Sequence, residues 1–395
     1  MTTPPLLIEN AHLYGPAADW DPGWLLADGG RIQQLGQGQP PELSAHPALR
    51  RIDARGLALL PGFIDLHVHG AAGHEAMDAS RDGLHAMARF YARHGVTGFL
   101  PTTWSAAHPA LLRALACIAA AVGPVPGGAS ILGAHVEGPY LNPARCGAQD
   151  TRLIRRANPG ETLQLLDTGV IRLLALAPEF DENLDLLDEC VRRGINVSAA
   201  HTDATYAQIQ AAVGRGLRHA THTFNAMRPF GHREPGTAGA VMALPEVRCE
   251  LIADTIHVHP AAIKILFDVK GPAGVILITD AIRAAGQPDG DYALDDRPVT
   301  VRDGAVRLPD GTLAGSVLTM DAALRNSLAA TGRPLRELWR AASLNAAQAI
   351  GLSASKGSLE AGQDADLVLL DAQHNVCFTI VGGEIVYQAG QPAPP

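Results

Sequence analysis

The two ends of the chain carry short apolar runs that are separated by turn residues. Near the N-terminus these runs lie in LLIENAHLYG, GWLLADGGRIQQLG and ALRRIDARGLALLPG, and near the C-terminus in GSLEAGQDADLVLLDAQHNVCFTIVGGEIVYQ. The segments DGGR and VGGE are typical of the turn in a β-hairpin. Two β-rich ends around a different middle predict a small β-sandwich domain built from residues 1–60 and 353–395.

The middle of the chain, residues 61–352, alternates between strand-like apolar runs and helical patterns. Strands are expected at 63–68, 96–100, 131–136, 171–177, 195–200, 219–222, 248–253 and 274–279. Helices are expected within 80–95, 108–122, 183–193, 205–213, 260–267 and 317–330. Alternating strands and helices of this kind predict a (β/α)8 barrel of the TIM type. The main alternative is a doubly wound open sheet, which would normally bring a glycine-rich phosphate turn that this sequence lacks.

Side chains that bind metals recur where the expected strands end. His67 and His69 come first, and because residues two apart in a strand point the same way, both should face one point. Later strands end at Glu137, His201, His222, His257 and Asp280. In a barrel the carboxyl ends of the strands meet at one rim, where barrel active sites are built. Packing alone would not gather so many ionisable groups there, because they are costly to bury unpaired.

The donor types indicate which cation fits. The set His67, His69, Glu137, His201, His222 and Asp280 offers nitrogen and carboxylate oxygen without thiolate. This chemistry suits a divalent transition metal, with zinc favoured and iron, manganese or cobalt as alternatives. The only lysines are Lys264, Lys270 and Lys356, and none ends a strand. A carbamylated lysine between two metal ions is therefore disfavoured, and Glu137 is the carboxylate available to bridge them.

Composition limits the partners and the compartment. The net charge is −9 and the basic residues form no run, which argues against a nucleic-acid partner. The five cysteines show no C-x-x-C spacing, a pattern typical of a reduced intracellular protein. No basic signal-peptide start occurs, and no apolar run reaches the roughly 20 residues of a membrane span. We therefore expect a soluble cytoplasmic protein that needs a local cationic pocket for any anionic substrate.

Several long motifs, in order along nearly the whole chain, resemble one known family. They are PGFIDLHVHG, AHVEGPYLNPARCGAQ, VSAAHTDATY, ATHTFNAM, GHREPG, IADTIHV, ITDA and LAGSVLTM. With them the sequence resembles the amidohydrolase superfamily and, within it, the N-acetylglucosamine-6-phosphate deacetylase family. The C-terminal GSLEAGQDADLVLLD is similar to a strand of many amidohydrolases and identifies only the superfamily.

The resemblance implies roles for particular residues. Glu137, His201 and His222 would bind one metal ion, while His67, His69 and Asp280 would complete a second site through Glu137. One or two ions per chain are therefore expected. Sugar contacts are implied at Ala148, Gln149, Asn225, Ala226, Leu313, Ala314 and Gly315. Arg233 and His257 resemble the family's phosphate binders, which are contributed across the interface of a homodimer.

The resemblance also implies a reaction. The acetyl group of N-acetyl-D-glucosamine 6-phosphate would be hydrolysed to give D-glucosamine 6-phosphate and acetate, in amino-sugar catabolism or cell-wall recycling. The metal would lower the pKa of water, and Asp280 would accept the proton and pass it to the leaving amine. Three positions depart from the family pattern: Gln149 where some members have His, Thr255 where Gly is usual, and Arg283 where small residues are common.

Three alternatives stay open at this point. The same chemistry on another phosphorylated acetamido-sugar, such as N-acetylgalactosamine 6-phosphate, needs the same ligands. An N-acyl-amino-acid deacylase would replace the phosphate with a carboxylate. A non-catalytic relative would be expected to have lost part of the ligand set, whereas all six candidate ligands are intact.

Overall fold

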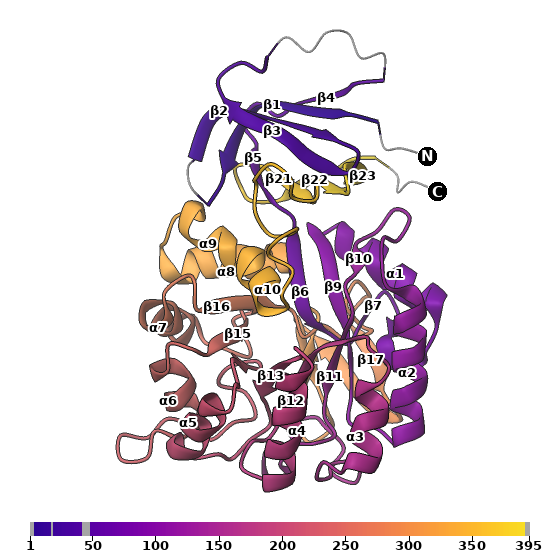
Figure 1. Ribbon diagram of the computed structural model, residues 1–395, viewed down its shortest axis with the longest axis vertical. Helices are drawn as coiled ribbons and strands as arrows, with labels where there is room; N and C mark the ends of the chain where they lie inside the picture. Colours follow the sequence, from indigo (N-terminus) through magenta and orange to yellow (C-terminus); the bar gives the residue numbers. More distant parts are fainter. Residues whose placement is uncertain (1–3, 17–18, 42–47, 392–395) are drawn as a thin grey trace.

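The computed structural model describes residues 4–16, 19–41 and 48–391. It consists of a β-sheet domain that both ends of the chain build and a barrel below it, as Figure 1 shows. The fold class expected from the sequence is confirmed. Within the described part of the chain, no helix combines the length and the apolar character needed to cross a membrane.

The sheet domain joins the two ends of the chain in one hydrogen-bonded sheet. Its strands are β1 (Leu6–Tyr14), β2 (Asp19–Asp28), β3 (Arg31–Gln37), β4 (Arg50–Asp53), β5 (Ala58–Pro61), β21 (Leu367–Leu370), β22 (Val376–Val381) and β23 (Glu384–Gln388). The order is β23-β22-β21-β5-β1-β2-β3, with β4 beside β1. The antiparallel pair of Leu59 with Leu369 links the N-terminal and C-terminal segments, and both side chains are fully buried. The centre of this sheet is therefore built from both ends of the chain.

A single residue, Gly62, separates the sheet domain from the barrel. Strand β5 ends at Pro61, and β6, the first barrel strand, begins at Phe63. A Cβ on Gly62 would collide with the side chain of Thr97, so the chain can cross here only as glycine. We propose that residues 1–60 and 353–395 form the sheet domain and that residues 61–352 form the barrel. Residues 1–3, 17–18, 42–47 and 392–395 of the first unit lie outside the described residues.

Eight parallel strands form the barrel. They are β6 (Phe63–Val68), β9 (Val96–Thr103), β11 (Ala134–Glu137), β12 (Ile171–Leu176), β13 (Asn196–Ala199), β14 (His219–Ala220), β15 (Arg248–Ile252) and β16 (Val275–Ile278). Every expected strand is present at its expected place, and the short β10 (Ser130–Ile131) extends the sheet beside β9. The strand expected at 219–222 ends early, because His222 already leaves the extended conformation with a φ of 30°.

The barrel closes where its first and last strands meet. The amide of Asp280 donates to the carbonyl of His67 over 2.9 Å, and Val68 forms a parallel bridge with Ala281. Below this bridge the buried carboxylate of Asp65 accepts a 2.6 Å hydrogen bond from the hydroxyl of Thr279. Burial raises the pKa of Asp65 to about 7. The closure therefore fixes His67 and Asp280 next to each other.

Ten α-helices are assigned in the described part of the chain, mostly between barrel strands. They are α1 (Arg81–Ala92), α2 (His108–Ala121), α3 (Pro159–Leu166), α4 (Asp181–Arg192), α5 (Tyr206–Gly214), α6 (Gly236–Ala243), α7 (Pro260–Lys270), α8 (Met320–Thr331), α9 (Leu335–Ala342) and α10 (Leu344–Ala349). The sequence did not predict α3, α6, α9 and α10, each of eight residues or fewer. In α6 small residues are buried nearly all round, so no polar face marks its period.

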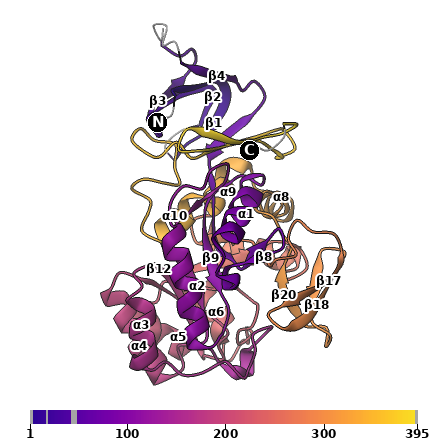
Figure 2. The same ribbon diagram turned by 90° about the vertical axis from the view of Figure 1, so that its right-hand side faces the viewer.

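A four-stranded antiparallel sheet is inserted between β16 and α8, and the sequence did not predict it. Its strands are β17 (Gly290–Leu294), β18 (Arg297–Arg302), β19 (Ala305–Arg307) and β20 (Leu313–Ser316). Figure 2 shows this insertion on one side of the barrel, near α8. An apolar cluster that includes Trp104, Ile282 and Val306 packs it onto the barrel rim. The insertion thereby becomes part of the wall around the mouth of the barrel.

Candidate metal and substrate site

The barrel brings all six candidate metal ligands to one place. Glu137 ends β11 and His67 lies in β6, while His201, His222 and Asp280 each come two residues after a strand. These last three have positive φ angles of 43°, 30° and 50°. A left-handed backbone is unfavourable for residues other than glycine, by roughly 1–2 kcal/mol each. The flanking strands keep the backbone in this strained conformation. The resulting turn directs each side chain toward the barrel axis.

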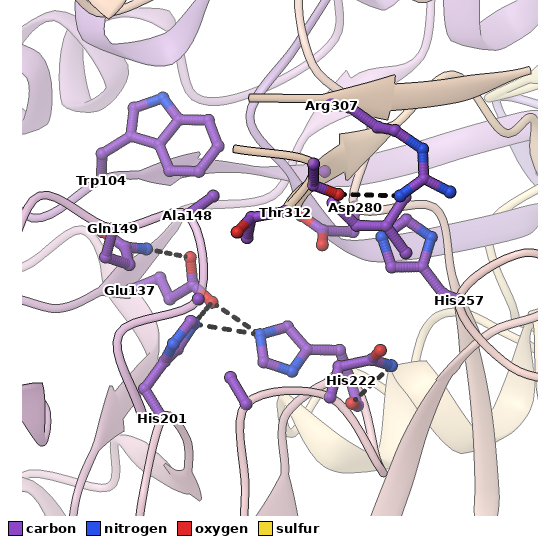
Figure 3. Close-up of a pocket in the computed structure, with 16 residues that line it drawn as sticks. Trp104, Glu137, Ala148, Gln149, His201, His222, His257, Asp280, Arg307 and Thr312 are labelled. Atoms are coloured by element: carbon purple, nitrogen blue, oxygen red, sulfur yellow. Dashed lines mark hydrogen bonds and ion pairs between the residues drawn. The ribbon is translucent and has the colours of Figure 1, made fainter. Parts of the chain in front are cut away.

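One group of ligand atoms forms around Glu137. Its Oε1 lies 3.2 Å from Nε2 of His201 and 3.1 Å from Nε2 of His222. The two histidine Nε2 atoms are 3.2 Å apart. All three side chains are almost fully buried, and Figure 3 shows them converging on one point. Three donors at these distances can hold one metal ion.

A second group lies beside the first and shares Glu137. Nε2 of His67 lies 3.2 Å from Nε2 of His69, and Oδ1 of Asp280 lies 3.5 Å and 3.2 Å from these two nitrogens. Nε2 of His69 is also 3.4 Å from Oε2 of Glu137. Oε2 of Glu137 thus faces His69, whereas Oε1, which faces the first group, also lies 3.6 Å from Nε2 of His67. The arrangement can hold one ion or two.

The partners of the outer ring nitrogens explain why a cation fits. Nδ1 of His69 faces the carbonyl of Thr102 at 3.2 Å, and Nδ1 of His201 faces the carbonyl of Arg145 at 2.9 Å. A carbonyl can only accept, so both Nδ1 atoms carry the proton. In the neutral rings Nε2 then presents a lone pair, and it faces carboxylate oxygens that also only accept. A cation between these atoms removes the repulsion, so the residues fit a metal ion.

A buried carboxylate that the sequence analysis missed supports His67 from below. Glu250 of β15 is fully buried, and its oxygens lie 3.1 Å from Nδ1 of His67 and 2.9 Å from Nε2 of His219. Carboxylates in this position orient a ligating histidine and make it more basic. The one signal in the sequence was an acidic residue within the apolar run RCELIA. Nε2 of His135, beneath the same cluster, has no hydrogen-bond partner within the described residues, and burial lowers the pKa of His135 to about 3.

The electrostatics reflect this crowding of opposite charges. Burial alone would raise the pKa of Glu137, but the facing rings of His67, His201 and His222 outweigh burial and lower it well below the ordinary value. Burial likewise opposes a charge on His67, yet the carboxylates of Glu137 and Asp280 raise its pKa well above the ordinary value. The site therefore keeps its carboxylates ionised and attracts positive charge.

Four of the six candidate ligands, Glu137, His201, His222 and Asp280, form the floor of a cavity of about 390 Å³. The predicted substrate residues that line it are Ala148, Gln149, Asn225, Ala226, His257, Leu313 and Gly315. Two others do not: Ala314 is fully buried in the apolar cluster under the inserted sheet, and Arg233 is exposed away from the cavity. Lining residues that the sequence analysis missed include Trp104, Arg307 and Thr312. The ring of Trp104 stacks on His69 with the ring centroids 3.5 Å apart.

Gln149 is tied to the candidate ligands. Its Nε2 donates to Oε2 of Glu137 over 2.7 Å, and its Oε1 accepts from the amide of Ser105 over 2.8 Å. The side chain thereby orients Glu137 and keeps one N–H for another acceptor. Arg283, by contrast, does not line the cavity, because it pairs with Glu75 at 2.8 Å and with Asp78 at 3.1 Å.

His257 lies across the cavity from Trp104 in Figure 3. Its Nδ1 is 2.6 Å from Oδ2 of Asp254, whose other oxygen accepts from the amides of Ile256 and His257. Asp254 fixes the ring so that Nε2 is free to meet a ligand. The turn that brings the two residues together passes through Thr255, whose φ is 67°. Glycine is usual at this position because it adopts a positive φ without steric cost, whereas the β-branched threonine is strained there.

The comparisons with known proteins agree on one family. A model described as the amidohydrolase family matches residues 58–386. The N-acetylglucosamine-6-phosphate deacetylase of Lysinibacillus sphaericus is 40% identical over 340 residues, which cover 86% of this chain and 88% of that protein. The N-acetylgalactosamine-6-phosphate deacetylase of Escherichia coli O157:H7 is 39% identical over 329 residues, covering 83% of this chain and 87% of that protein.

The solved structures give the same picture. A mutant N-acetyl-D-glucosamine-6-phosphate deacetylase from Mycobacterium smegmatis, in complex with N-acetyl-D-glucosamine-6-phosphate, superposes with a TM-score of 0.91. That chain is 34% identical to this one, and the match covers 98% of this chain and 100% of that chain.

The strained turn at Thr255 gives a test of the site's construction. Thr255→Gly should stabilise the protein by about 1 kcal/mol, because glycine adopts the left-handed conformation without a steric penalty. The side chain is exposed and makes no hydrogen bond within the described residues, so little else is lost. The measurement is the melting temperature by calorimetry, which should rise. Thr255→Ala keeps the Cβ and should gain less; an equal or lower melting temperature for the glycine variant would contradict the strain.

Proposed function

The chain belongs to the amidohydrolase family, and we propose that it removes the acetyl group from N-acetyl-D-glucosamine 6-phosphate. The products are D-glucosamine 6-phosphate and acetate, which places the reaction in amino-sugar catabolism or cell-wall recycling. The observation that carries the proposal is the convergence of two histidine–carboxylate groups on Glu137 at the floor of one cavity. Relatives of this name align over most of the chain and support the choice of substrate.

Amidohydrolases depend on metal ions, and the candidate groups are present. In our proposal Glu137, His201 and His222 hold one divalent transition-metal ion, and His67, His69 and Asp280 complete a second site. Zinc suits these donors best, with iron, manganese or cobalt as alternatives. When bound, such an ion lowers the pKa of water and polarises a carbonyl group.

The protein's own groups move the protons. Asp280 is 7% exposed at the cavity floor, and although burial opposes ionisation, the neighbouring His67 and His69 lower its pKa. The ionised carboxylate takes a proton from the attacking water as the oxygen bonds to the acetyl carbon. The same proton then passes to the amide nitrogen as the carbon–nitrogen bond breaks. Gln149 holds Glu137 in place, and its remaining N–H can meet the acetyl oxygen.

The galactosamine epimer is the alternative that a specific observation supports. The deacetylase of that sugar phosphate in Escherichia coli is 39% identical to this chain, almost as similar as the glucosamine enzyme of Lysinibacillus sphaericus. An N-acyl-amino-acid deacylase and a non-catalytic relative find no such support among the relatives described above.

A substrate panel tests the function directly. Acetate release should be fastest from N-acetyl-D-glucosamine 6-phosphate, slower from the galactosamine epimer, and at least about tenfold slower from the sugars without phosphate. Release is measured with a coupled acetate assay on each compound at several concentrations. Equal rates with and without phosphate would contradict the proposed substrate, and a faster galactosamine epimer would select the alternative.

We also propose a homodimer in which the partner's copy of Arg233 reaches the phosphate. Arg233 is exposed, forms no ion pair within the described residues and lies outside its own cavity. Phe230, three residues earlier, is 62% exposed and offers an apolar side chain to such an interface. The cytoplasmic location expected from the sequence stays a prediction.

The number of metal ions bound per chain in ligand variants distinguishes the two proposed metal sites. The purified protein should carry one to two transition-metal ions per chain. His201→Ala should lose the ion held by Glu137 and His222, whereas His69→Ala should lose only the other one. Elemental analysis of the variants measures both, and His232→Ala, which removes an exposed histidine, is the control. Full activity of protein shown to be free of metal would contradict the mechanism.

Asp280→Asn tests the proton transfer. The substitution keeps the shape of the side chain but removes the proton acceptor, so kcat should fall by at least about 100-fold while KM changes little. Steady-state kinetics should be read together with metal content, because Asp280 also faces His67 and His69. A variant that keeps its metal and the wild-type kcat would show that another group accepts the proton.

A further inference from the structure

The cavity that would receive a dianionic substrate is built on negative charge. Glu137 and Asp280 lie at its floor, and the whole chain carries a net charge of −9. The phosphate is carried on C6 of the sugar, away from the acetamido group on C2 that would meet the metal ions, so it needs a cation of its own. Among the residues that line the cavity in the described part of the chain, Arg307 is the one arginine or lysine.

The other arginines around the mouth are already engaged. Arg145 and Arg228 both pair with Asp203, at 2.8 Å and 2.7 Å. Arg283 pairs with Glu75, and Nη1 of Arg297 donates to the carbonyl of Ala148 over 2.6 Å. These guanidinium groups therefore already hold the loops of the rim together, and none of the four lines the cavity.

Arg307 differs from them in its surroundings. Its Nη1 donates to the carbonyl of Gly311 over 2.8 Å, and no carboxylate of the described residues lies within ion-pair distance. The other N–H groups of this guanidinium donate to no atom of the described residues. The hydrogen bond to Gly311 restricts the side chain, so less conformational freedom is lost when a ligand binds.

The inserted sheet gives Arg307 a fixed base. Val306, the preceding residue, is fully buried in the apolar cluster that packs the sheet onto the barrel. A tight turn follows, closed by hydrogen bonds between Leu308 and Thr312 and between Gly311 and Leu308. This turn also brings Thr312 into the cavity wall. Figure 3 shows the Arg307 side chain on the same side of the cavity as His257.

We propose that Arg307 binds the phosphate of the substrate, together with His257 and the hydroxyl of Thr312, and thereby sets the preference for phosphorylated sugars. The inference rests on the proposed function and deepens it. A guanidinium fork matches two phosphate oxygens at once, whereas a neutral sugar offers it no comparable partner. The phosphate is then held by the same chain that supplies the catalytic groups, and an arginine of a partner subunit adds to this binding instead of providing all of it.

The test compares Arg307→Ala with a matched control on the same sheet. Arg302→Ala removes an identical charge from an exposed position of β18 that does not line the cavity. Arg307→Ala should lower kcat/KM for N-acetyl-D-glucosamine 6-phosphate by about 10- to 100-fold, mainly through KM. The unphosphorylated sugar should change by less than about twofold, and Arg302→Ala should leave both substrates unchanged within the same limit. Arg307→Lys should recover part of the loss, since it restores the charge without the fork.

A binding measurement separates phosphate recognition from catalysis. By calorimetry Arg307→Ala should bind D-glucosamine 6-phosphate about 10- to 100-fold more weakly than the unmodified protein does. Unchanged affinity and unchanged kcat/KM in Arg307→Ala would overturn the inference, as would an equal loss for both sugars. The proposed function fails separately, namely if the unmodified protein releases no acetate from either sugar phosphate.

Discussion

The position of one carboxylate, Glu137, determines how the rest of the site can work. Its Oε1 faces His201 and His222, and its Oε2 faces His69 while accepting a hydrogen bond from Gln149. Such a buried anion is tolerable only when opposite charge surrounds it. Because both of its oxygens are used, a change at Glu137 itself affects both ligand groups. Any movement of β11, which carries Glu137, changes both groups at once.

The barrel stabilises this arrangement by holding residues that are strained locally. His201, His222 and Asp280 all have left-handed backbones, and each lies just beyond a strand whose parallel pairing fixes the chain. Strain of this kind persists only where the surrounding structure outweighs it. Beneath the ligands, Glu250 orients His67 and Asp65 joins the first strand to the last. The buried polar groups below the site therefore hold its ligand-bearing strands and side chains in position.

Much of the barrel and its ligand set could be predicted because both follow short-range rules. Apolar runs mark buried strands, and polar residues at their ends must meet at one rim. Glu250 was missed because its partner His67 is 183 residues away, and nothing in the sequence reveals that pairing. The inserted sheet was missed because its strands are only three to six residues long and partly exposed. Because the inserted sheet was not predicted, the sequence analysis could not place Arg307 near the cavity.

The two halves of the site rest on different parts of the fold, and this division has a physical consequence. The reacting groups come from parallel strands that also form the core, so a change in them disturbs folding and chemistry together. Arg307 and Thr312 come from an inserted sheet that is attached to the rim by an apolar cluster and by the bond from Arg297 to Ala148. Binding energy from a remote part of the substrate can lower the barrier at the reacting carbonyl. A sheet attached in this way can therefore change substrate preference while the barrel, and the chemistry at its mouth, stay as they are.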